Sequence, residues 1–457
     1  MTTTSNPAEP PSLPLPCTVV DGFTFAAVGD LIGPLRPETT LNRPGFNEVM
    51  RLLQQADIGF GNQEGSIFDI DAIGGTRAAE NGGGYPLSNL EVARDLKAMG
   101  LDVVSKANNH ATDWGAEGLL ATCRALVDAG VVPAGAGPSK PAARAPVFIE
   151  TPKGRVAVIS TATTYTPMSE AGNADGDTLP RPGISVLGLK AITLLPECDM
   201  VGVRRAAKLQ GMDTALDSRA RGDERELTIG SETFRVADEP GLTYEMNSLD
   251  HRELLRAVRG AKQGADLVAF TVHAHETASG DGVDRSPADF LPKLMHSVID
   301  SGADIALTTG PHLVRGIEIY RGKPIFYGLG SFFLELEGSR GVSTERARQL
   351  GIDPLDYTGA EFVRKRLGVL SDAWYDSVVA VCEFRAGGTC EVRLHPLRLE
   401  RKDGFRWQGA PRLAMGGDAR RILEQLQHDS RPFGTEIEIA GDVGVIRIQS
   451  PFATLGV

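Results

Sequence analysis

Polar side chains suited to metal binding follow six short apolar runs of the sequence. The runs FTFAAV, IGF, VVSKA, LVAFTV, IALTT and PIFYGL are each typical of a buried strand. The segments that come after them are Gly29-Asp30, Gly61-Asn62-Gln63-Glu64, Asn108-Asn109-His110, His273-Ala274-His275-Glu276, Gly310-Pro311-His312 and Gly330-Ser331. Because the carboxyl ends of parallel strands meet at one edge of a sheet, we expect these side chains to converge.

The predicted ligand set contains carboxylates, amides and imidazoles but no thiolate. Such a mixture suits Mn²⁺, Fe or Zn²⁺, whereas Mg²⁺ and Ca²⁺ prefer oxygen alone. A pair of divalent ions needs a bridging carboxylate, and it converts a shared water into hydroxide near neutral pH. The pattern therefore predicts a metal-dependent hydrolase.

Each signal also has a structural interpretation when it is taken alone. Asp30 could cap a turn or a helix, and Asn108–His110 could be ordinary loop chemistry. The pair His273 and His275 would direct both imidazoles to one face of a strand, while His312 alone favours a hydrogen-bonded structural role. The joint occurrence at several strand ends favours the metal site.

The elements that position these residues alternate between strands and helices, which indicates an α/β fold with mainly parallel strands. The predicted helices are Phe46–Gln55, Leu90–Met99, Glu117–Ala129, Arg252–Lys262 and Phe290–Ser301. Two stretches, about 165–247 and 335–376, interrupt the alternation. We expect them to be loop-rich or locally helical insertions that cover or shape the site.

Composition excludes several classes of protein. The 457 residues carry a formal net charge of −12, so binding to nucleic acid or anionic lipid is disfavoured. The five cysteines form no CxxC pair, which disfavours a disulfide framework or a thiolate zinc site. Residues 1–17 are predicted to be a flexible leader that is not a signal peptide, and no run of about 18 apolar residues predicts a membrane span. We expect a cytoplasmic protein, with homo-oligomerisation possible.

Several motifs together resemble the CapA family of poly-gamma-glutamate capsule biosynthesis proteins, within the calcineurin-like metallophosphoesterase superfamily. They are, in family order, AAVGD, GNQEGSI, SKANNHATDWGAEGL, TLPRPGI, FTVHAHE and PHLVRGIEIYRGKPIFYGLGSFF. The resemblance spans roughly residues 23–334. It implies a four-layer α/β/β/α sandwich, so that residues 18–457 form a single domain with the two insertions.

The resemblance also implies a ligand set for two metal ions. The family's metal positions fall on Asp30, Glu64, Asn109, His273 and His312. In this assignment Asp30 is the aspartate of the first strand, and Glu64 is the acidic residue that bridges the ions.

Three positions depart from the family pattern. Gly310 occupies the place of a histidine, His275 that of a glycine, and Ser331 that of an asparagine. Our hypothesis is that His275 supplies the imidazole that Gly310 lacks. If it does not, one metal is held tightly and the second weakly.

The remaining candidates concern substrate and catalysis. His110 would stabilise negative charge on the attacked group or protonate the leaving group, and Asp113 would orient His110 unless it caps the next helix. Asn62 and Arg315 are assigned to substrate binding, although an exposed surface role is the alternative for Arg315.

The predicted function is hydrolysis of an ester, amide or phosphoester in a small-molecule or glutamyl-type substrate by a metal-bound hydroxide. The alternative is a non-catalytic accessory protein of poly-gamma-glutamate synthesis or binding. A nucleotide-dependent transferase ranks last because the sequence contains no GxxxxGK[ST] motif.

Overall fold

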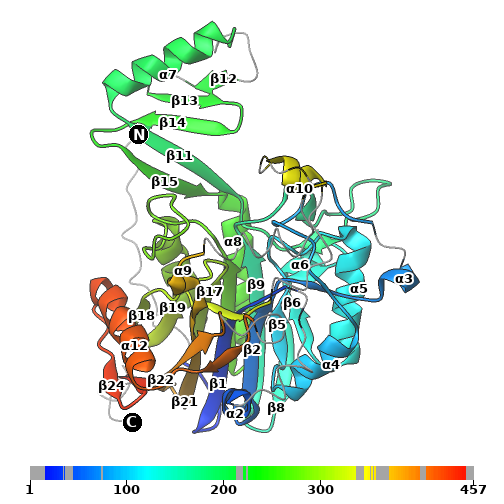
Figure 1. Cartoon of the computed structure of the whole chain (residues 1–457), viewed down its shortest axis with the longest axis vertical. Helices are drawn as coiled ribbons and strands as arrows, with labels where there is room; N and C mark the ends of the chain where they lie inside the picture. The colour runs from blue at the N-terminus through cyan, green and yellow to red at the C-terminus, as the bar shows by residue number, and fades with distance from the viewer. Residues whose placement is uncertain are drawn as a thin grey trace, which may run out of the picture.

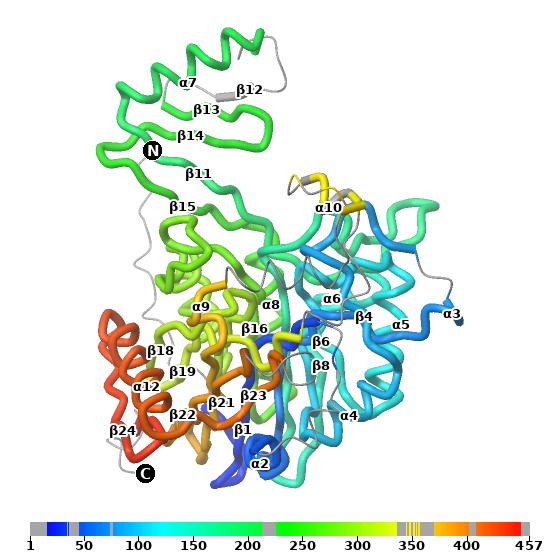
Figure 2. Tube along the Cα trace, viewed as in Figure 1, coloured from blue at the N-terminus to red at the C-terminus, as the bar shows by residue number. Residues whose placement is uncertain are grey.

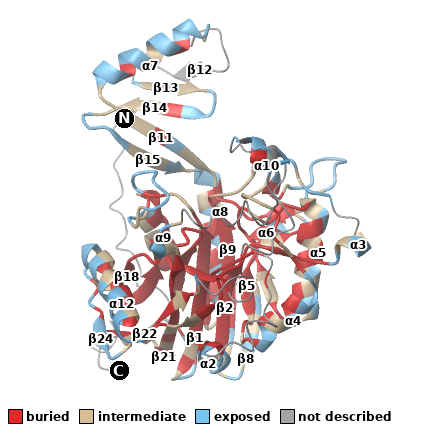
Figure 3. Cartoon of the chain, in the orientation of Figure 1, coloured by how far each residue is buried: buried red, intermediate tan, exposed pale blue. Residues whose placement is uncertain are grey.

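Two β-sheets packed face to face form the body of the protein, and helices cover their outer faces (Figure 1). The computed structural model describes residues 16–33, 35, 45–73, 76–212, 220–222, 225–335, 344–349, 351, 353, 355–356, 370–401 and 408–448. Buried residues concentrate in the strands of the two sheets, as Figure 3 shows.

The ten-stranded sheet has the order β24-β25-β22-β21-β1-β2-β5-β6, with β20 paired to β1 and β23 to β22. Its strands are β24 (Glu438–Ala440), β25 (Val443–Arg447), β22 (Gly388–Leu399), β21 (Asp376–Arg385), β1 (Phe23–Ile32), β2 (Ile58–Gln63), β5 (Val103–Ser105), β6 (Val132–Ala134), β20 (Ser331–Leu334) and β23 (Pro411–Leu413). Strands β1, β2, β5 and β6 are parallel. Strand β21, far away in the sequence, lies antiparallel beside β1 (Figure 2).

The six-stranded sheet has the order β18-β19-β17-β16-β9-β8. Its strands are β18 (Ile317–Tyr320), β19 (Lys323–Phe326), β17 (Ile305–Thr309), β16 (Leu267–His273), β9 (Gly154–Ala162) and β8 (Val147–Thr151). The four strands β9, β16, β17 and β19 run parallel.

Side-chain alternation along the strands creates three apolar layers. In β16, Leu267 and Ala269 face the core between the sheets, whereas Val268 and Phe270 face the outer core. Helices α8 (Ser248–Gly264) and α9 (Phe290–Asp300) close that outer core. Helices α2 (Phe46–Gln54), α4 (Glu91–Ala98) and α5 (Gly115–Asp128) cover the ten-stranded sheet. The predicted four-layer α/β/β/α sandwich is confirmed.

A third sheet projects from the body and occupies much of the first expected insertion (Figure 1). It has the order β12-β13-β14-β11-β15 and is accompanied by α7 (Glu197–Leu209). The strands are β11 (Leu189–Leu195), β12 (Ala220–Gly222), β13 (Glu226–Ile229), β14 (Glu232–Val236) and β15 (Gly241–Met246).

The expectation of loop-rich or merely helical structure for this insertion was wrong. Met200 and Ala207 of α7 pack against Leu227, which gives the insertion a small core. Charged side chains at strand positions hid this pattern in the sequence: Arg235 pairs across the sheet with Glu226.

The structure describes part of the expected leader and part of the second expected insertion. Cys17, expected in the leader, is 1% exposed in the core between the sheets, and its carbonyl accepts a hydrogen bond from Gly387 N–H. Residues 1–15, and most of the expected insertion at 335–376, lie outside the described residues. In the part of the chain that the structure describes, no helix combines the length and apolar character needed to cross a bilayer.

Candidate metal centre

The carboxyl ends of parallel strands from both sheets meet at one place. In the ten-stranded sheet Asp30 of β1 lies in register with Asn62 of β2 and with Ser331 of β20. In the six-stranded sheet His273 ends β16 in register with Thr309 of β17. A hydrogen-bonding distance of 3.2 Å between Asn62 Nδ2 and His273 Nδ1 joins the two sheets at this point.

Asp30, Glu64 and His273 form the centre of the site. One potential ligand atom from each lies within 4.8 Å of the others, and all three residues are buried. Glu64 Oε2 is buried and has no hydrogen-bond partner among the described residues. Two buried carboxylates with one free oxygen and an imidazole are a donor set that fits a divalent cation.

The electrostatics of the two carboxylates differ. Burial and the neighbouring charge of Asp30 raise the pKa of Glu64 well above its usual value. Burial alone would raise the pKa of Asp30, but the hydrogen bond and the charge of His312 hold it below its usual value. Without a cation, therefore, negative charge is favoured on Asp30, and Glu64 holds a proton up to a higher pH than an exposed glutamate does.

The assignment of Asn62 to substrate binding is not supported by its position. Its side chain is fully buried, and Nδ2 lies 2.8 Å from Asp30 Oδ1 and 3.3 Å from Glu64 Oε1. Asn62 thus lies among the ligand candidates, and its role in substrate binding stays a prediction.

The loop after β5 contributes Asn109 and His110. Asn109 Oδ1 is 3.0 Å from His273 Nε2, and its Nδ2 donates to the Gly82 carbonyl. His110 Nδ1 is 2.6 Å from Asp113 Oδ2, and Asp113 also accepts a hydrogen bond from Gly82 N–H. Helix α5 begins at Gly115 with Trp114 as its N-cap, so Asp113 is not the cap of this helix. The hydrogen bond between Asp113 and His110 is instead the contact that orienting His110 requires.

The loop after β17 contacts Asp30 in two ways. Gly310 N–H lies 3.0 and 3.1 Å from the two carboxylate oxygens of Asp30, and His312 Nδ1 is 3.0 Å from Oδ2. His312 has φ of 53°, a backbone conformation that costs a non-glycine residue about 1–3 kcal/mol. Strain of this kind clusters at binding sites, in agreement with the assignment of His312.

His275 lies beside His273 and His312. Its Nε2 is 3.0 Å from His273 Nε2, and its ring centroid is 5.2 Å from that of His312. Burial lowers the pKa of His273 to about 3 and lowers that of His275 as well. Both imidazoles are thereby kept neutral, which is the form that binds metal.

The surface role considered for Arg315 was wrong. Arg315 is fully buried, and its guanidinium points at the carbonyls of Glu276 and Asp284, 3.4 and 3.3 Å away. These carbonyls belong to the loop after β16. The position of Arg315 therefore supports a role in fixing that loop, and it does not support direct substrate contact.

Two residues of the site escaped the sequence analysis. Lys106 is fully buried, and its ammonium donates to the carbonyls of Gln63, Glu64 and Gly65 at 3.0–3.1 Å. A lysine inside the apolar run VVSKA was a usable signal, because a buried ammonium needs several acceptors. The Trp374 ring lies 4.9 Å from the His312 ring, and no sequence motif marks it.

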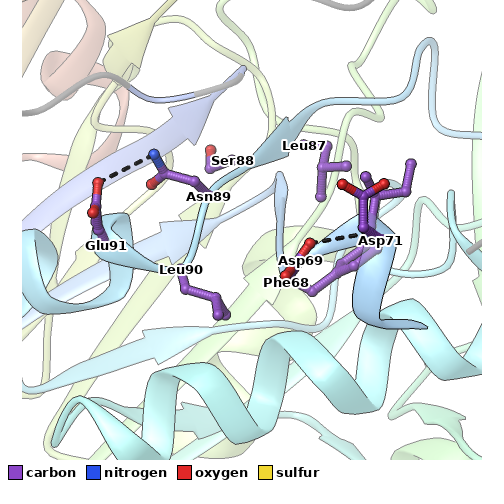
Figure 4. A pocket seen from close by; sticks show the side chains of 9 residues that line it. Phe68, Asp69, Asp71, Leu87, Ser88, Asn89, Leu90 and Glu91 are labelled. Atoms are coloured by element: carbon purple, nitrogen blue, oxygen red, sulfur yellow. Dashed lines mark hydrogen bonds between the residues drawn. The ribbon is translucent and has the colours of Figure 1, made fainter. Parts of the chain in front are cut away.

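A separate hollow of about 330 Å³ lies at β4 (Leu87–Ser88) and the segment that follows β3 (Ser66–Ile67), and Figure 4 shows the side chains that line it. It is lined by Phe68, Asp69, Ile70, Asp71, Leu87, Ser88, Asn89, Leu90 and Glu91. None of the metal-ligand candidates lines it, so the hollow is distinct from the metal centre.

Comparison with known proteins shows the family to which the chain belongs. The family model for bacterial capsule synthesis protein PGA_cap matches residues 24–335, which include every candidate ligand. The uncharacterized protein y4sH of Sinorhizobium fredii is 40% identical over 443 residues, covering 94% of each chain.

Two more distant relatives have informative names. The capsule biosynthesis protein CapA of Bacillus anthracis is 22% identical over 317 residues, covering 68% of this chain and 60% of that protein. A probable polyglutamine synthesis accessory protein of Mycobacterium tuberculosis is 28% identical over 253 residues, covering 55% of this chain and 50% of its own. The resemblance to CapA proteins is confirmed, and the chain belongs to the bacterial capsule synthesis protein PGA_cap family.

Proposed function

We propose that the protein is a metal-dependent hydrolase that acts on an ester, amide or phosphoester bond. The observation that carries the proposal is the convergence of Asp30, Glu64 and His273 from three strand ends, with Glu64 Oε2 unpartnered among the described residues. The carboxylates and the neutral imidazole would hold one divalent ion, of Mn, Zn or Fe. When bound, such a cation acidifies water and polarises the bond under attack.

A second ion would use the other side of Asp30. His312 contacts Asp30 Oδ2 directly, and His275 lies between His312 and His273. This arrangement supports our hypothesis that His275 replaces the imidazole missing at Gly310. Asn109, which contacts His273 Nε2, is the remaining candidate ligand.

The pair His110 and Asp113 would carry the proton. Asp113, 1% exposed, accepts a hydrogen bond from His110 Nδ1–H, and this places the exchangeable proton or lone pair on Nε2. The His110 side chain is 12% exposed, so it is reachable from outside. We assign it to charge stabilisation on the attacked group or protonation of the leaving group.

The names of the relatives favour a glutamyl-type substrate. To test whether the protein is a hydrolase and which bond it cleaves, the protein loaded with Mn²⁺, Zn²⁺ or Fe²⁺ should be assayed with γ-glutamyl amides, carboxylic esters and phosphoesters. We expect turnover of at least one class, and its loss in Asp30→Asn. Lack of turnover of all three by a fully metal-loaded protein would reject the hydrolase.

The same names support a second candidate, an accessory protein that binds poly-glutamate without cleaving it. The two candidates differ in one measurement. An accessory protein would bind the polymer with an affinity that His110→Gln leaves unchanged, and it would release no smaller product. The hydrolase would shorten the polymer or a small analogue, and His110→Gln would abolish the shortening.

A further inference from the structure

We infer that the side-chain amide of Asn62 is itself a ligand of the cation, with its oxygen turned toward the metal. The inference rests on the proposed metal centre and adds a residue to it. In the structure Asn62 Nδ2 lies close to three acceptors at once: 2.8 Å from Asp30 Oδ1, 3.3 Å from Glu64 Oε1 and 3.2 Å from His273 Nδ1. The amide is thus in contact with each member of the central triad.

In this arrangement the NH₂ group of Asn62 contacts the same three atoms that a cation would bind. An NH₂ group carries two protons, so at least two of the three acceptors must share one proton. A divalent ion that binds the same three atoms would come next to Nδ2, whose protons would repel it. Rotation of the amide by half a turn exchanges nitrogen and oxygen with almost no change of shape. The oxygen then becomes a further ligand and the repulsion becomes an attraction.

The turn of the amide also changes the contact between Asn62 and Asn108. At present Asn62 Oδ1 accepts a long hydrogen bond of 3.3 Å from Asn108 Nδ2, which also donates to the Gln63 carbonyl at 2.9 Å. Asn108 Oδ1 is buried and has no partner in the part of the chain that the structure describes. Once turned, Asn62 Nδ2 would face Asn108 Nδ2, so this hydrogen bond between the two side chains would be lost and Asn108 Oδ1 would still have no donor. The turn therefore costs one long hydrogen bond, which the attraction between the cation and the amide oxygen would offset.

The experiment is a Co²⁺ titration of the full chain followed by visible absorption, because the cobalt bands report the number and geometry of ligands. Asn62→Leu removes the amide at similar volume. Gln63→Leu is the matched control, since Gln63 is the next residue of β2, equally buried, and donates only to Gly65 O among the described contacts. We expect Asn62→Leu to weaken Co²⁺ binding about 10–100-fold and to change the spectrum. Gln63→Leu should preserve both.

A crystal structure of the wild-type protein with bound metal gives a second readout that does not depend on folding of a variant. We expect the Asn62 amide oxygen at about 2.0–2.2 Å from the cation. An unchanged cobalt spectrum in Asn62→Leu, or an Nδ2 that still donates to Asp30 beside a bound ion, would overturn the inference while leaving the metal centre intact. Failure of the wild type to bind Co²⁺ would overturn both.

Discussion

His275 occupies the space that a side chain at Gly310 would need. A Cβ placed on Gly310 would lie 2.8 Å from His275 Cδ2 and 3.0 Å from His273 Cε1, closer than side-chain carbons normally approach. This close approach supports the hypothesis that His275 supplies the imidazole that Gly310 lacks.

Gly310→Ala should disturb the metal centre. The backbone at this position has φ of 104°, which costs alanine about 1 kcal/mol or more, and the new methyl group would displace the imidazoles. We expect a lower melting temperature and metal binding that is weaker about 10–100-fold, measured by calorimetry. Gly22→Ala is the control, because Gly22 has φ of 79° with nothing within 4 Å of the added Cβ. Equal effects of the two variants on metal affinity would contradict the prediction.

His275→Ala should reduce the amount of bound metal. If His275 replaces the missing imidazole, its removal leaves His312 and Asp30 to hold the second ion, and that ion should be lost on dialysis. Metal analysis of wild type and variant after the same dialysis checks this. An unchanged stoichiometry would reject the replacement hypothesis.

Asp113→Asn should separate metal binding from turnover. The variant retains an oxygen that accepts from Gly82 N–H, but its amide no longer stabilises the orientation and charge of His110. We expect the metal content to stay constant while kcat falls about 10²–10⁴-fold. If kcat is insensitive to Asp113→Asn, the pair does not transfer the proton.

Metal binding should release a proton under mildly acidic conditions. Because the pKa of Glu64 is raised, its carboxyl keeps a proton at pH values where an exposed glutamate is ionised, and the cation must displace it. His273, with a pKa of about 3, has no proton to lose in this range. The affinity should therefore decrease as the pH falls, by up to about tenfold per pH unit. Calorimetry in buffers of different ionisation enthalpy counts the protons, and an affinity independent of pH between 5 and 7 would exclude a protonated Glu64.

The sequence predicts an α/β fold with meeting strand ends because both depend on patterns local to each strand, whereas the four-layer sandwich is what the family resemblance implies. Apolar runs such as Leu267–His273 identify a buried strand, and a polar residue directly after the run marks its carboxyl end. The projecting sheet was not predictable in this way, since its strands are short, half-buried and rich in paired charges such as Lys190 with Glu226.

The features of the site that the sequence did not predict have a different cause. The burial of Arg315 and the contact of Trp374 with His312 arise from packing between segments that lie far apart in the chain. The position of Asn62 follows from the register of β1 and β2, which places it opposite Asp30. A single sequence does not specify that register closely enough to distinguish a substrate contact from a ligand.

The central claim is that Asp30, Glu64 and His273 hold a divalent cation, and elemental analysis of the purified protein tests it most directly. Wild-type protein and Glu64→Gln would be dialysed together against Mn²⁺, Zn²⁺ or Fe²⁺ and then against metal-free buffer. The account predicts a stoichiometric amount of at least one metal in the wild type and a large loss in the variant. Only trace metal in the wild type, or equal retention by both proteins, would contradict it.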